Sequence, residues 1–401
     1  MNTFNFTAKI VSIKDTEKFH PIEKKSFKTG WENLTVRFNC VSGTNRVMAM
    51  TQGGKWQKDN KNIIKTFGKS TTDKNGAVVR GTQIDIPWEK RFDADQIDKV
   101  AGFKKFTCDT GDTRMRYKVQ NLIEAFGKKT VTDEMMEEVG IYNIDDAKAA
   151  LEKSLAKKKV FLSEWDFAEH MAKVVESDKF KDKQFYISGN YEVSYNADKN
   201  RFYANYHVNR VILAPDDAAP STEMKIDFYF GENSWDDSRY EETGKCYVNG
   251  WISYYDNALK KNGFKDVTVV VKEDEKKTAG LKRKFVVDDN IKQIGLTLKV
   301  IEGAEVVELT MDMLDEETRE DIECGLMDFE EVKRQLGGRV VGDRVSELRF
   351  VELTPKKNKP QDTAYSVEDM HAAKADDVKN SLFDDDDDDV DLFDDDDDDD
   401  L

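Results

Sequence analysis

At 401 residues, 38% of them apolar, the chain exceeds what one hydrophobic core usually supports, so two compact domains with appendages are expected. No stretch approaches the roughly 18 consecutive apolar residues that span a bilayer, and no basic segment followed by an apolar run opens the sequence, which argues against membrane insertion and secretion. The net charge of −18 is segregated: residues 1–214 carry 37 basic against 29 acidic residues, a net of +8, whereas residues 215–380 carry −12 and residues 381–401 carry −14.

Cysteine, histidine and glycine usage points away from metal sites and catalysis. The four cysteines lie far apart without a CxxC pair, and four histidines are scattered singly, so we expect no metal, no cofactor and a reducing cytoplasm. GxxxxGK[ST], HExxH and GxSxG are missing, and so is a GxGxxG between a strand and a helix. The expected function is therefore not enzymatic.

Alternating apolar and polar residues predict β-strands in the first 50 residues. Residues 4–10 and 34–40 each place four apolar side chains on one face, as in strands with one face in a core. A basic insertion of loops, short strands and helices is predicted at about 52–160, and helix N-caps are predicted at Thr132 and Ser163. Residues 184–213 indicate a β-hairpin.

The second half repeats this character with an acidic balance. Strand-like segments resume after Pro215, a helix is predicted from Glu316 to about Leu336, and a final strand follows near 343–353. We expect domains at 1–214 and 221–354. Beyond Pro355 the periodicity ends, so 355–401 is predicted to be a disordered acidic tail.

The order of three strands, a helix and a closing hairpin predicts an OB-type β-barrel. The expected fold class is mainly β with helical insertions (α+β): an OB-type β-barrel, a second OB-like β-barrel and the tail. The hairpin FYISGNYEVSYN...RFYANYHVNRVIL resembles the last two strands of the single-stranded DNA-binding protein family. That resemblance implies single-stranded DNA as ligand, a role in DNA replication, recombination and repair, a tail that recruits replication and recombination proteins, and a bacteriophage origin with action in the host bacterial cytoplasm.

Residues 1–214 hold both ingredients of a single-strand groove, which are cations that follow the phosphates and aromatic faces on which bases stack. A net positive charge on an otherwise acidic chain also favours a polyanionic partner. Taken singly, such lysines are ordinary surface residues, so the prediction depends on the whole set and on the TRMRYK cluster. The candidate nucleic-acid-binding residues are Lys9, Arg37, Arg46, Lys55, Trp56, Lys58, Lys61, Lys65, Lys69, Arg80, Arg114, Arg116, Tyr117, Lys118, Arg201, Tyr203 and His207.

Strand alternation supplies the last three of these and a secondary set. Arg201, Tyr203 and His207 share one predicted face, opposite a core face with Val208 and Ile212. In the acidic half an aromatic ladder at period two is a candidate for secondary stacking, but the net charge of −12 favours the alternative, that it packs against the first barrel or a second subunit. Its members are Tyr247, Trp251 and Tyr255.

The C-terminal sequence SLFDDDDDDVDLFDDDDDDDL repeats a Leu-Phe pair before each Asp run. Fourteen Asp residues on a flexible link would compete with DNA for a basic groove, and the apolar pairs would bind a partner protein. The alternative to these binding roles is an acidic tail that only increases solubility, although such a tail needs no apolar pairs. The predicted partner-binding residues are Leu382, Phe383, Leu392, Phe393 and Leu401.

The main alternative function is an acidic protein-interaction module, such as a DNA mimic or an assembly chaperone. A mimic is acidic across its folded surface, whereas residues 1–214 are net basic, so DNA binding is favoured. A strand-annealing protein needs the same groove and is not separated from a protective binder by the sequence. Oligomeric state, site size and preference between DNA and RNA are likewise left open.

Overall fold

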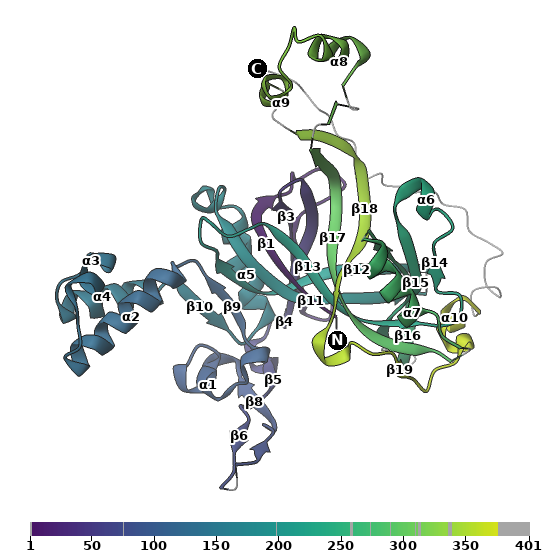
Figure 1. Cartoon of the computed structure of the whole chain (residues 1–401). Helices are drawn as coiled ribbons and strands as arrows, with labels where there is room; N and C mark the ends of the chain where they lie inside the picture. The colour runs from purple at the N-terminus through teal and green to yellow at the C-terminus, as the bar shows by residue number, and fades with distance from the viewer. Residues whose placement is uncertain are drawn as a thin grey trace.

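The computed structural model describes residues 2–375 except 75, 198, 257–259, 273, 289, 309, 312–313 and 336–338. Strands dominate it, which confirms the mainly β class with helical insertions (Figure 1). Within the described residues, no helix is both long and apolar enough to cross a membrane.

Five strands close into a first circuit of hydrogen-bonded neighbours. β1 pairs with β3, β3 with β4, β4 with β12, β12 with β11, and β11 with β1; only the β4–β12 pairing is parallel. The helix α5 (Glu164–Val175) lies in the chain between β4 and β11, as the sequence predicts. The strands are β1 (Thr3–Ser12), β3 (Trp31–Ser42), β4 (Asn45–Trp56), β11 (Gln184–Asn196) and β12 (Arg201–Leu213), and β2 (Ile22–Ser26) pairs with the outer edge of β3.

Alternation sets the core face of this circuit, with one exception. The apolar residues predicted to face inward in β1 and β3 are all buried. In β12 the register shifts beside Gly189 of β11, so that Asn209 becomes an extra residue. The alternation therefore reverses, and Val211 is fully buried where Ile212 was expected.

A second circuit has the same pairing order. β13 pairs with β15, β15 with β16, β16 in parallel with β18, β18 with β17, and β17 with β13. The helix between its third and fourth strands is α7 (Glu275–Phe285), which the sequence analysis missed. The strands are β13 (Ser221–Phe230), β15 (Cys246–Asp256), β16 (Lys261–Val271), β17 (Lys292–Glu308) and β18 (Arg339–Leu353).

The helix predicted from Glu316 occupies a different place in the topology. It forms α8 (Glu316–Glu323) and α9 (Phe329–Gln335), which lie between β17 and β18 at the far end of that hairpin (Figure 1). The sequence of α7 gives only a weak helical signal, because its eleven residues carry a narrow apolar stripe. The buried residues of that stripe are Leu281 and Phe285, four positions apart.

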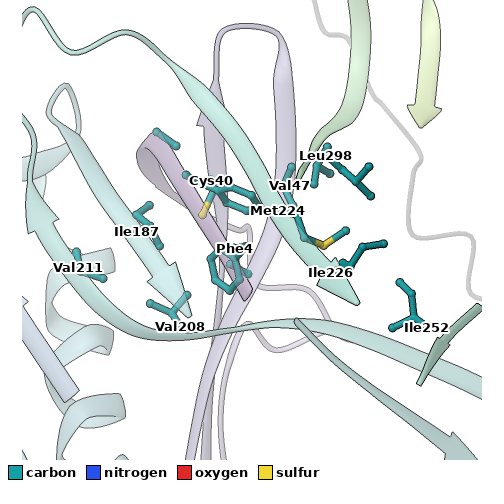
Figure 2. Close-up of a cluster of buried hydrophobic side chains, with 14 of the residues drawn as sticks. Phe4, Cys40, Val47, Ile187, Val208, Val211, Met224, Ile226, Ile252 and Leu298 are labelled. Atoms are coloured by element: carbon teal, nitrogen blue, oxygen red, sulfur yellow. The ribbon is translucent and has the colours of Figure 1, made fainter. Parts of the chain in front are cut away.

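The two circuits share a sheet and a core. β1 pairs along one edge with β13, from Thr3 opposite Lys225 to Thr7 opposite Ser221. Figure 2 shows side chains of both circuits in one buried cluster, including Phe4 and Met224. The loop between β12 and β13 contains the predicted domain boundary, and the division at 214 and 221 stays a prediction.

The insertion lies between β4 and α5 and has two parts. One is a lobe of short strands: β5 (Ile63–Phe67) with β8 (Gln83–Pro87), β6 (Thr71–Thr72) with β7 (Val78–Val79), and α1 (Ala94–Lys99). The other is the helical module, set apart from the strands in Figure 1 and built from α2 (Thr113–Lys128), α3 (Asp133–Val139) and α4 (Ile144–Leu155). β9 (Phe106–Asp109) and β10 (Lys158–Phe161) join the insertion to the edge of β12.

The C-terminal segment is ordered further than predicted. Residues from Pro355 were expected to be disordered, yet β19 (Gln361–Asp362) pairs with β17 and α10 (Val367–Ala375) follows. The reason is apolar packing, because Met370 is buried against Tyr229 and Phe264 and Tyr365 packs beside them. Two further short elements are the strand β14 (Trp235–Asp236) and the helix α6 (Tyr240–Thr243).

Candidate nucleic-acid interface

Two adjoining hollows, of about 550 Å³ and 700 Å³, lie over β3, β4 and β12 of the first circuit. They are called the groove below. Strands β3, β4, β11 and β12, the first residue of α5 and the insertion all contribute to its walls. The residues that line both hollows are Trp31, Gln52, Gly54, Trp56, Glu164, Glu192 and His207.

A tryptophan pair forms the floor of the groove. Trp31 begins β3 and Trp56 ends β4, directly opposite one another in the register. Their rings meet edge to face, with centroids 5.2 Å apart, and both are half-buried. A Cβ on Gly54 would lie 2.1 Å from Cζ2 of Trp31, so the indole rests on bare backbone that only glycine provides. Both indoles consequently border the groove and stay partly exposed to it.

A second glycine brings a helix to the rim. A Cβ on Gly53 would lie 2.2 Å from the backbone nitrogen of Trp165, so α5 begins directly against β4. Ser163 caps that helix by accepting a hydrogen bond from the Asp166 amide. The first helical residue, Glu164, consequently stands at the groove.

Glu164 has an unusual environment for a surface carboxylate. Its side chain is exposed, yet partial desolvation by the groove walls raises its pKa, the negative charge of Glu192 raises it further, and Lys104 opposes both. His207 Nε2 lies 3.9 Å from Glu192 Oε2. The groove thus contains acidic groups beside its aromatic floor.

The insertion supplies a basic wall, called the lysine wall, on one side of the groove. Lys61 stands over the Trp56 ring, with Nζ 5.3 Å from its centroid. Lys104 lies near Phe103, whose side chain is 76% exposed. Burial, and then the charge of Lys69, lower the pKa of Lys105. The members of the wall are Lys61, Lys65, Lys104 and Lys105.

The predicted residues divide by location. Those that line the groove are Trp56, Lys61, Lys65 and His207. Lys55 lies over the Trp165 ring beside it, and Arg201 and Tyr203 lie further along β12. Lys58, Arg46 and Arg80 are exposed elsewhere. Three more have acidic neighbours away from the groove: Lys9 beside Asp182, Arg37 near Glu23 and Lys69 beside Asp98.

The TRMRYK cluster lies in the helical module, where it does not join the groove residues. The prediction for Arg116 is corrected, because its buried guanidinium donates to both Asp109 carboxylate oxygens, at 2.6 and 2.8 Å, and to the Ser154 carbonyl. Arg114 pairs with Asp217 and Lys118 with Glu138, while Tyr117 is exposed. Arg116 therefore fastens α2 to β9: four of its five N–H donors are used within the protein, and its burial keeps it from a phosphate at the surface.

The secondary ladder is partly covered. Trp251 packs against the residues around Phe264, and its ring centroid lies 5.7 Å from that of His371 in α10. Tyr247 is half-buried, whereas Tyr255 is 56% exposed. Stacking and packing were the two roles considered for this ladder, and Trp251 packs. Its partner is the C-terminal segment, whereas the expected partner was the first barrel or a second subunit. The tail residues Leu382, Phe383, Leu392, Phe393 and Leu401 lie outside the described residues.

Sequence reasoning missed several groove residues. Trp31 shares the outward face of its strand with Arg37, so the alternation that selected Arg37 also indicates Trp31. Glu164 and Glu192 are missed because the criteria for a single-strand groove select cations and aromatic residues only. Phe27, Phe103 and Lys104 lie in segments whose placement only the fold defines.

Neither the scan of protein-family models nor the search of curated proteins found a match. Among solved structures, the chain is similar to a deletion mutant of the single-stranded DNA-binding protein from Thermus aquaticus. The identity is 7% and the TM-score 0.27, over 75% of this chain and 87% of that one. Similarity at this level carries no weight beside the strand pairings and the groove.

Proposed function

We propose that both circuits are OB-type barrels and that the chain binds single-stranded DNA in the groove of the first, without enzymatic activity. The observation that carries this proposal is the Trp31–Trp56 pair on bare glycine backbone, with the lysine wall beside it. Aromatic faces stack bases of any sequence, each stack contributing about 1–3 kcal/mol, and lysines follow the phosphates.

The geometry favours single strands over duplex. In a duplex, each base is already stacked and paired, so its faces are closed to Trp31 and Trp56. A single strand turns its bases toward the floor while its phosphates meet Lys61, Lys65 and Lys104 on the wall.

The wider role is part of the same proposal. A protein that covers single strands without reacting with them serves replication, recombination or repair, and the Asp-rich tail recruits partner proteins. The bacteriophage origin, the cytoplasmic location and the partners stay predictions.

Fluorescence anisotropy with labelled single-stranded DNA, duplex and RNA of one sequence, at two salt concentrations, tests the proposal. We expect single-stranded DNA to bind far more tightly than duplex and its affinity to fall as salt rises. Equal binding of duplex would contradict the preference for single strands. Failure to bind any nucleic acid, together with capture of basic proteins, would favour the acidic interaction module instead.

A further inference from the structure

Two carboxylates face the same space as the tryptophan pair. Glu164 begins α5 and Glu192 lies on β11, and both line each of the hollows that Trp31 and Trp56 line. Among the described residues, the Glu164 carboxylate makes no hydrogen bond or ion pair. The side chain of Glu192 is 55% exposed, and its Oε2 lies 3.9 Å from Nε2 of His207.

Carboxylates at this position repel phosphates, so they weaken binding unless DNA offers them hydrogen-bond donors. An ionised carboxylate only accepts hydrogen bonds. The donors of a single strand lie on the edges of its bases, and the exocyclic amino groups of cytosine, adenine and guanine are the most accessible. Thymine and uracil carry a carbonyl oxygen where cytosine has its amino group, and the one donor on this edge is their ring N3–H, at the position where cytosine has an acceptor nitrogen.

We propose that Glu164 and Glu192 read the edges of bases stacked on Trp31 and Trp56, so that the groove prefers bases with an exocyclic amino group over thymine or uracil. This inference rests on the proposed function and adds its base preference. The lysine wall holds the phosphates on one side, which leaves the base edges directed at α5 and β11. Each carboxylate then accepts a charge-assisted hydrogen bond from a base edge, which is stronger than a bond between neutral groups.

Oligomers of deoxycytidine and deoxyuridine test this inference, because the two bases have the same size and differ only along one edge, where cytosine has an amino group and an acceptor nitrogen and uracil has a carbonyl oxygen and a ring N–H. We expect the wild type to bind the cytidine oligomer about tenfold more tightly, the size of one charge-assisted hydrogen bond at the lower end of its range. In E164Q/E192Q the ratio should fall to about two or less. Affinity for the uridine oligomer should rise at low salt, since two negative charges leave the groove.

The matched control is E169Q, an exposed position on the same helix outside the groove. It should keep the wild-type ratio, and thermal unfolding should show that all variants are folded. Equal wild-type affinity for both oligomers, or a tenfold ratio that E164Q/E192Q leaves unchanged, would overturn the base-reading inference while the proposed function stands. Failure of the wild type to bind either oligomer would instead overturn the proposed function.

Discussion

Replacing Lys61, Lys65 and Lys104 with alanine should flatten the salt dependence of single-strand binding. All three are exposed side chains on the lysine wall. Each phosphate contact to a single strand contributes roughly 0.7 to the log–log slope of affinity against salt, so losing three lowers it by about 2. A fourfold rise in salt should therefore cost the wild type about 16-fold more affinity than the variant.

The assay is anisotropy titration at four or more salt concentrations, and the control is R114A/K118A. Those two residues are also cations, but they lie on the helical module, where they pair with Asp217 and Glu138. The control should keep the wild-type slope. A flattened slope in the control with an unchanged slope in the triple variant would refute the assignment of the groove.

Three other predictions address stacking, folding and the tail. Trp31→Ala and Trp56→Ala should each weaken binding by about 1–3 kcal/mol without changing the salt slope, whereas exposed Tyr142→Ala should have no effect in the same titrations. Arg116→Ala should lower the free energy of unfolding by roughly 3–5 kcal/mol in urea titrations, because buried Asp109 loses its partner. Burial opposes the ionisation of Asp109, but hydrogen bonds from Arg116 and Gly111 lower its pKa. The contribution of the Arg116–Asp109 pair to the free energy of unfolding is therefore present near neutral pH and disappears as pH falls through that lowered pKa. Deleting the Asp-rich tail should tighten binding at low salt, with a gain that shrinks as salt screens the charges in the same anisotropy assay.

Local pattern was sufficient for much of the first circuit. The strands at 4–10 and 34–40, the N-caps at Thr132 and Ser163 and the hairpin at 184–213 depend on neighbours in the sequence. The bulge near Asn209, the edge pairing of β1 with β13 and the packing of Met370 depend on contacts between distant segments. Periodicity does not report such contacts, so the core role of Val211 and the ordered stretch after Pro355 were not predicted.

The groove shows the same division between local and distant information. Charge and aromatic content selected Trp56, Lys61 and Lys65, which do line it. Composition ranked the TRMRYK cluster highest, yet it cannot distinguish a free cation from Arg116, whose partner Asp109 lies on a neighbouring strand. Tertiary pairing, not local charge density, decides which cations remain available.

Photo-cross-linking tests the central claim most directly. A single-stranded oligomer that carries 5-iododeoxycytidine at every second position is bound, irradiated and digested, and the cross-linked peptides are sequenced by mass spectrometry. The peptides should contain Trp31 or Trp56, and cross-linking should fall when unlabelled single strand, but not duplex, is added. Cross-links confined to the helical module or to the second circuit would contradict the placement of single-stranded DNA in the groove.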